Sequence, residues 1–361
     1  YLNAYVKITN SPQTDRIDTL CKIRGRGNSS WTVMPKKSYK IKFYDKVAPI
    51  SAAPNKSWVL LAESFDKSLL RWPFMFEVSK AVEMPFTCEY KHVELILNGD
   101  YVGTYLLTEQ IERKDNRVVT DKEGYLIEND WYYSSEPLYF FTDRLKLPYT
   151  FKYPDADDGD IVENDENYTF IRDYINKVEK ALEIIEESEE YSQFIDINSY
   201  AKWYISQELT GNIDPNLFYV LKNKYSKLEA GPVWDADWSL GEAAQMEGKW
   251  VSPPYIPLAC EIIWNHRFYF EDLLKDERFK NEVKRIWRSV RYKIPDVLTR
   301  IHEEEELVRY AQKSNFERWP GFNKYLGVGL TAFGTWEEEV DYVYQFFENR
   351  LAWFDSYIEN F

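Results

Sequence analysis

The chain has 361 residues, of which 44% are hydrophobic and 29% charged, a balance typical of a folded globular protein rather than a disordered one. Lys and Arg number 45 against 60 Asp and Glu, and the formal net charge of −15 argues against a nucleic-acid binder and against docking on anionic lipid. No apolar run reaches the roughly 18 residues of a membrane-spanning helix. The aromatic share of 17% is typical of a large aromatic core and also suits planar ligands such as sugars or bases.

Strand and turn patterns dominate the first 130 residues. Residues 38–43 alternate polar and apolar side chains, which predicts a half-buried strand. Residues 93–97 predict a second strand, and Asn98-Gly99 predicts a hairpin turn into a third over 101–107. Between these strands, residues 66–82 predict a helix that has Pro73 near its first turn, where proline is tolerated.

Helical spacing dominates the second half. It predicts helices over 171–185 and 197–209, the latter ended by Gly211, and a capping-box pattern from Thr335 to Glu338 opens the last helix. We therefore expect an α+β fold in one domain, residues 1–361. A strand-rich N-terminal lobe would span about 1–130 and a helical C-terminal lobe 131–361, with a ligand crevice between them.

Cysteine and histidine are sparse and scattered, which argues against a zinc site. Buried small apolar side chains are the favoured interpretation of the three cysteines, Cys21, Cys88 and Cys260. The histidines are His92, His266 and His302. Because the chain begins at Tyr1 rather than Met, we expect a fragment or a processed form that has already lost any signal peptide.

A first candidate segment combines glycines with cations. Residues 24–31 read Arg-Gly-Arg-Gly-Asn-Ser-Ser-Trp, and Lys36, Lys37, Lys40 and Lys42 follow. Glycine lets a backbone approach a ligand closely, and free N–H groups beside Ser and Asn side chains suit phosphate oxygens. The segment predicts an anion site, against the alternative of a hairpin with a solvated basic face.

Two further segments carry carboxylates. Asp214 lies in a loop between Asn212 and Asn216, which is either an Asx-turn or a catalytic carboxylate with amide neighbours. If residues 233–237 are extended, Asp235 and Asp237 point to the same side, where a cation such as Mg²⁺ would relieve their repulsion. The alternative for this pair is an exposed acidic turn.

Two acidic runs are interpreted as structural. Residues 155–160 resemble a calcium loop, but the glycine is fifth rather than sixth, so we expect an exposed acidic loop. Residues 303–306 predict a solvated helix face.

Taken together, the segments resemble the CotH-like (spore-coat protein H) family of atypical kinases. The motifs that match, in order, are Arg24–Trp31, Lys36–Phe43, Asp66–Arg71, Leu97–Tyr105 with Glu109, Asn212-x-Asp214 and Trp234-Asp235-x-Asp237-Trp238-x-x-Gly241. They cover roughly residues 20 to 241.

The resemblance implies a two-lobed protein-kinase-like fold and transfer of the γ-phosphoryl group of ATP to a Ser or Thr of a protein substrate, with Mg²⁺ or Mn²⁺. It implies Asp214 and Asp237 as catalytic residues, and Asp237, Asp235 and Asn216 as metal ligands. The implied nucleotide contacts are Arg24, Arg26, Asn28, Ser29, Lys40, Lys42 and Arg71. For Arg71 the alternative is a structural role, in which it fixes the position of its helix. It also implies an exported, extracellular or cell-surface protein.

The sequence departs from the family pattern in two places. Trp72 stands where an Asn is expected after Leu-Arg, and the stretch from Asp214 to Asn216 is shorter than expected. Two alternatives stay open: a pseudokinase scaffold that binds nucleotide without turnover, and a carbohydrate-binding or carbohydrate-active surface protein.

Overall fold

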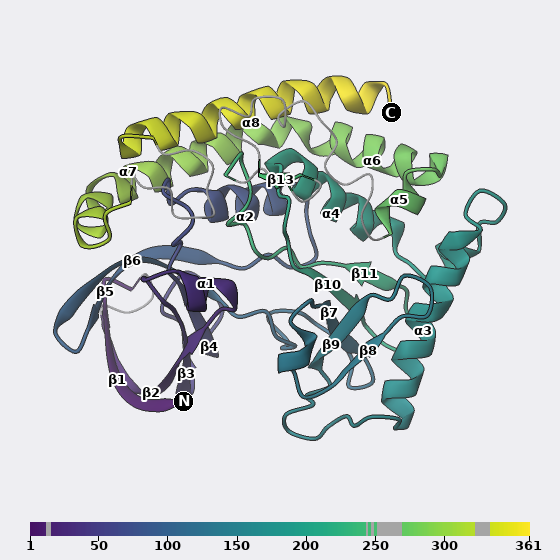
Figure 1. Cartoon of the computed structure of the whole chain (residues 1–361), viewed down its shortest axis with the longest axis horizontal. Helices are drawn as coiled ribbons and strands as arrows, with labels where there is room; N and C mark the ends of the chain where they lie inside the picture. The colour runs from purple at the N-terminus through teal and green to yellow at the C-terminus, as the bar shows by residue number, and fades with distance from the viewer. Residues whose placement is uncertain (12–15, 243–244, 247–248, 251–268, 322–332) are drawn as a thin grey trace.

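The structure is a computed structural model that describes residues 1–11, 16–242, 245–246, 249–250, 269–321 and 333–361. Cys260 and His266 lie outside these residues. The chain forms an α+β fold in which two antiparallel sheets lie beneath a layer of helices (Figure 1). In the described part of the chain, no helix is long and apolar enough to cross a membrane.

The first sheet is curled and has six strands in the order β1-β2-β3-β4-β6-β5. Asn98 and Gly99, with φ values of 53° and 91°, form the predicted tight turn between its last two strands. Its strands are β1 (Leu2–Thr9), β2 (Arg16–Arg26), β3 (Ser38–Val47), β4 (Asn55–Leu61), β5 (Tyr90–Leu97) and β6 (Asp100–Glu109). The short helix α1 (Ser29–Val33) joins β2 to β3.

The second sheet has five strands in the order β11-β10-β7-β9-β8. These strands are β7 (Tyr125–Asn129), β8 (Tyr139–Phe141), β9 (Pro148–Tyr153), β10 (Leu217–Leu221) and β11 (Leu228–Ala230). The expectation of a mostly helical second half holds for helices over Glu166–Glu183 and Ile197–Thr210, close to the predicted ones. It is wrong for residues 139–153 and 217–230, where short strands show too few alternations to be recognised. The lobe boundary near residue 130 stays a prediction, although the first sheet ends at Glu109 and β7 belongs to the second.

The helices are α2 (Arg71–Ala81), α3 (Glu166–Glu183), α4 (Ile197–Thr210), α5 (Phe270–Leu273), α6 (Glu277–Val290), α7 (Ile294–Arg318) and α8 (Trp336–Glu359). A hairpin of β12 (Gln245–Met246) and β13 (Lys249–Trp250) completes the described elements. The predicted helix over 66–82 begins only at Arg71, because Asp66 to Leu70 form a turn held by the Asp66 side chain. Gly211 ends α4 in a left-handed conformation, and Thr335 and Glu338 form the predicted capping box of α8.

Two apolar cores hold these layers. The larger core packs the helices against the second sheet and includes all of the buried face of α2. The smaller core fills the curl of the first sheet and includes Cys21, Ile41, Phe43 and Trp58. The burial of Cys21 and Cys88 as free thiols confirms the structural interpretation of those two cysteines.

Candidate active site

A cavity of about 240 Å³ lies between the two sheets, beside the start of α2. It is lined by three segments that are far apart in the sequence: residues 26–30, residues 214–216 and residues 234–238. The end of β7 and the loop after β4 complete its wall. The structure thus brings together Arg26, Asn28, Ser29, Asp214, Asn216, Asp235 and Asp237 from the predicted site.

The turn between β2 and α1 forms one rim of the cavity. Gly27 has φ +103°, and a Cβ there would lie 2.4 Å from Ser30 Oγ. At Gly25 a Cβ would lie 2.2 Å from the Trp31 ring, so Gly25 is required by space and Gly27 by its conformation. Arg26 projects from this turn over the ring of Trp234, with 5.5 Å from its guanidinium carbon to the ring centroid.

The acidic segment is not a strand, and the premise of an extended 233–237 is wrong. Asp235 has φ +67°, a left-handed conformation that breaks the alternation of side chains. Both carboxylates nevertheless line the cavity. Asp237 Oδ1 accepts a hydrogen bond of 2.7 Å from Trp72 Nε1, and the Asp235 carbonyl accepts one of 2.7 Å from Asn212 Nδ2.

The loop that carries Asp214 is tied to the same segment. Asn212 is fully buried, and its Oδ1 accepts the backbone N–H of Asp214 at 3.2 Å. The N–H of Asn216 reaches the Trp234 carbonyl at 3.2 Å, and its Nδ2 donates to Glu128 at 2.6 Å. Asp214 itself is exposed at the cavity mouth, which leaves its carboxylate accessible to a substrate.

The acids of the cavity oppose one another's ionisation. Burial, and then the charges of Asp237 and Asp214, hold the pKa of Asp235 well above its usual range. Burial raises the pKa of Asp237 to about 7, against the hydrogen bond from Trp72. Burial also lowers the pKa of Arg26, while Asp235 and Asp237 favour its charged form. Positive charge inside the cavity would therefore be stabilised.

The donor atoms suit a hard divalent cation. Asp235 and Asp237 supply carboxylate oxygens, and Asn129 Oδ1, buried at the end of β7, has no hydrogen-bond partner. Mg²⁺ prefers such oxygens and usually keeps several waters and substrate phosphates as its other ligands. In the described part of the chain, no group of three or more His, Cys, Asp or Glu side chains is arranged to hold a metal. Asp235, Asp237 and Asn129 are the residues of the cavity that would hold such a cation.

Three predicted nucleotide contacts lie off the cavity wall. Arg24, Lys40 and Lys42 are on β2 and β3, on the strand face that leads toward Arg26, and they do not line the cavity. Burial, and then the charge of Arg24, lowers the pKa of Lys40 to about 8. Their contact with a nucleotide stays a prediction.

Arg71 does not reach the cavity either. It is fully buried, its Nη1 lies 2.6 Å from Asp66 and its Nη2 lies 2.9 Å from Glu242. Its Nε donates to the Ser239 carbonyl at 3.0 Å. Glu242 and Asp66 raise its pKa above the ordinary value, although burial opposes this. These contacts favour the alternative, that Arg71 fixes its helix, here against the Asp237 loop, and a phosphate contact stays a prediction.

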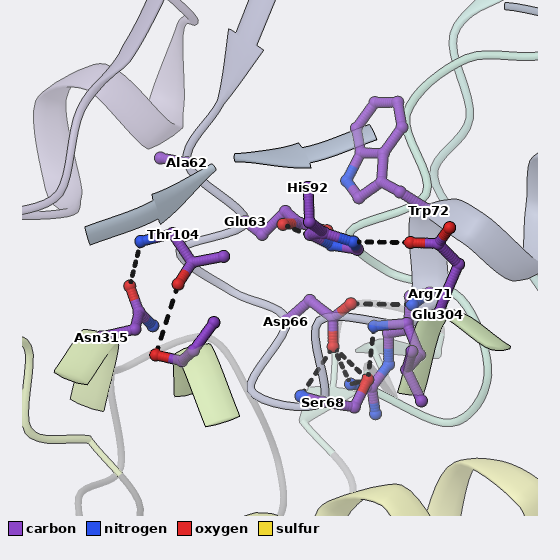
Figure 2. A network of polar contacts seen from close by, with 12 residues as sticks. Ala62, Glu63, Asp66, Ser68, Arg71, Trp72, His92, Thr104, Glu304 and Asn315 are labelled. Carbon is purple, nitrogen blue, oxygen red and sulfur yellow. Dashed lines mark hydrogen bonds and ion pairs between the residues drawn. The ribbon is translucent and has the colours of Figure 1, made fainter. Parts of the chain in front are cut away.

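A buried row of charges behind the cavity was not foreseen. Figure 2 shows His92 of β5 between Glu63 and Glu304, with contacts of 3.3 Å and 3.1 Å. Burial alone would lower the pKa of His92, but Glu63 and the hydrogen bond with Glu304 raise it to about 9. Glu63 also lines the cavity.

The prediction of a solvated face over residues 303–306 is thus wrong for Glu304, because the row pairs it with a buried histidine. No local pattern distinguishes Glu304 from its exposed neighbours Glu303 and Glu306. The acidic residues 157–160 are exposed, as predicted.

Asn129 and Trp72 were also missed as site residues. Asn129 only ends an apolar strand, and Trp72 is the second residue of α2, just after the Asp66–Arg71 motif, so neither position indicates a cavity contact by itself. The one available signal was that Trp72 stands where an Asn was expected, and this is the residue that donates to Asp237.

The chain was compared with known proteins. No curated protein sequence matches it significantly. A family model described as CotH kinase protein matches residues 23–354, which is most of the chain and includes every segment of the cavity wall. The chain therefore belongs to the CotH kinase family.

Proposed function

We propose that this protein is a Mg²⁺- and ATP-dependent kinase that transfers the γ-phosphoryl group to Ser or Thr of exported or surface proteins. The observation that carries the proposal is the meeting of Asp214, Asp235 and Asp237 with the Arg26–Ser30 turn in one cavity. Membership of the CotH kinase family supports a kinase-like enzyme. The proposed architecture is two-lobed, with the curled sheet as the N-terminal lobe.

Each group has a role in this proposal. Asp214, accessible and oriented through Asn212, would accept the proton of the acceptor hydroxyl. Asp237 and Asp235 would hold the cation, with Asn216 or Asn129 as amide donors. Mg²⁺ would neutralise charge on the phosphates during transfer. Arg26, Asn28 and Ser29 would contact the phosphates, and Lys40, next along the strand face, would add charge.

Nucleotide binding is tested first, by thermal unfolding with ATP and Mg²⁺. A ligand at 100 times its Kd stabilises the folded state by about 2.7 kcal/mol. We expect a metal-dependent rise in Tm that Asp237→Ala abolishes and Asp158→Ala, in the exposed acidic loop, retains. A rise produced by oligosaccharides instead of nucleotide would favour the carbohydrate alternative, for which the exposed Trp131 at the cavity wall is the supporting feature.

Transfer is then tested with radiolabelled ATP and a protein acceptor. Asp214→Asn should lower kcat by about 10²- to 10⁴-fold, the usual contribution of a general base. An Asp214→Asn, Asp237→Asn double variant should be inactive, and retained transfer by it would refute the mechanism. Nucleotide binding without transfer in the wild type would identify a pseudokinase scaffold.

A further inference from the structure

An unpaired column of cations lies on one face of the first sheet. We call it the basic ladder, and its members are Lys22, Arg24 and Arg26 on β2 and Lys40 and Lys42 on β3. Alternate residues of a strand share a face, and the odd-numbered Cys21, Ile41 and Phe43 are buried in the smaller core. The even-numbered cations therefore lie on the opposite face.

Strand register places these cations directly against one another. Lys22 lies opposite Lys42, and Arg24 lies opposite Lys40. Like charges at facing positions destabilise a sheet. The two neighbouring like-charge pairs therefore lower the stability of the sheet, and the fold itself does not require them. None of the five forms an ion pair with another described residue. Glu112, whose charge favours the protonated form of Lys40, is itself paired with Arg117 at 2.5 Å.

The ladder begins at the cavity and extends away from it. Arg26 lines the cavity, and successive same-face positions on a strand are about 7 Å apart, so Lys22 lies about 14 Å beyond Arg26. The triphosphate of a nucleotide is shorter than this. The phosphates of a nucleotide held at Arg26 would therefore not reach the outer pair, Lys22 and Lys42, both of which are solvent-exposed.

We infer that Lys22 and Lys42 bind acidic side chains of the acceptor polypeptide, which follows the ladder out of the active site. This inference rests on the proposed function and adds a substrate class to it: a Ser or Thr with Asp or Glu residues several positions away. Charge complementarity supports it, because a chain with a net charge of −15 concentrates cations along this one path.

The test uses two peptides with the same Ser, one carrying a distal run of Glu and the other Gln. Lys22→Gln, which breaks the outer pair, is compared with Lys56→Gln, which removes equal charge from an exposed position outside the ladder. The ladder variant should raise KM for the Glu peptide about tenfold and leave kcat and KM for ATP unchanged. Its Tm should rise, because a like-charge pair is removed, and the control should behave as wild type.

Binding of the fluorescently labelled Glu peptide without nucleotide, followed by anisotropy at increasing salt, separates this inference from the proposed kinase activity. If no phosphoryl group is transferred to either peptide, the proposed kinase activity is refuted. The anisotropy measurement still shows whether the ladder binds the acidic peptide. Equal binding of the Glu and Gln peptides by the wild type overturns the inference. So does a ladder variant that raises KM for ATP instead, since the outer pair would then serve the nucleotide.

Discussion

At the scale of single residues, Trp72 ties the start of α2 to the acidic segment of the cavity. Its ring is 2% exposed, packs edge-on against Trp234 at 5.0 Å and donates its N–H to Asp237. An indole is a donor only, so it fixes one carboxylate oxygen and leaves the other for a cation. A side-chain donor is thus retained where the expected Asn would supply one.

Replacement of Trp72 by Phe tests this role, because it removes the N–H and keeps an aromatic ring. We expect a several-fold loss of Mn²⁺ affinity, measured by calorimetry without nucleotide, and a loss of stability of about 1 kcal/mol from the hydrogen bond. Trp287→Phe is the matched control, since that indole donates to Asp355 at 2.9 Å far from the cavity. Equal metal affinity in the two variants would show that Trp72 only packs.

At the scale of elements, α7 joins the curled sheet to the helical layer through polar contacts. Asn315 accepts the backbone N–H of Thr104 at 3.1 Å, and Glu304 meets His92, as Figure 2 shows. Trp319, just after α7, donates to the Val102 carbonyl at 2.9 Å. These contacts require β6 to approach α7 closely, which Gly103 permits.

Gly103→Ala should therefore destabilise more than Gly99→Ala. Both glycines have positive φ, so alanine is strained at each. Only at Gly103 does a Cβ meet neighbours, Asn315 Oδ1 at 2.6 Å and Trp319 Nε1 at 3.1 Å. We expect Gly103→Ala to lower the free energy of unfolding, measured by chemical denaturation, by roughly 2 kcal/mol more than Gly99→Ala does. Equal losses in the two variants would mean that α7 shifts to accommodate the Cβ at little cost.

The His92 row should make stability depend on pH. Its pKa is about 9 in the folded protein and 6.5 ordinarily, so its contribution is complete below pH 6.5 and lost as pH rises through 9. As the pH rises between these values, the free energy of unfolding of the wild type should fall by up to about 3 kcal/mol more than that of His92→Gln. Urea titrations at several pH values measure the difference. His302→Gln, on the exposed surface, should keep the wild-type dependence.

At the scale of the whole molecule, Arg71 connects elements from three parts of the chain. It binds Asp66 before α2 and Glu242 after the Asp237 loop, while the neighbouring Lys67 lies 3.7 Å from Glu339 of α8. Trp336, at the start of α8, also donates to the Ser68 carbonyl at 3.0 Å. The Asp237 loop and the last helix are thus held by neighbouring charges around the start of α2.

Arg71→Lys should be strongly destabilising, because lysine lacks the planar fork and its single ammonium cannot pair with both Asp66 and Glu242 as the guanidinium does. Loss of one member of a buried ion pair costs about 3 to 5 kcal/mol. Arg24→Lys, at an exposed position, should leave Tm unchanged. An Arg71→Lys protein with normal Tm and no nucleotide binding would instead restore the phosphate contact expected from the sequence.

The sequence correctly predicted the turns and helix ends that depend on a few consecutive residues. The Asn98-Gly99 turn, the αL stop at Gly211 and the Thr335 capping box each depend on residues within a few positions, and all three are confirmed. The second sheet was missed because its strands are short, and two of them, β7 and β10, are fully buried and show no alternation. The start of α2 was placed too early because Asp66 satisfies backbone donors in a turn instead.

The sequence by itself determined the fold class, the family and the three segments that form the cavity, since motif chemistry is written in consecutive residues. The tertiary structure alone decided which members of those segments meet. It separated Arg26 at the cavity from buried Arg71, and it brought Asn129, Trp72 and Glu63 to the site. The reason is physical: burial, cross-strand register and long-range ion pairs join residues as far apart in the sequence as Lys67 and Glu339, and no local pattern carries that information.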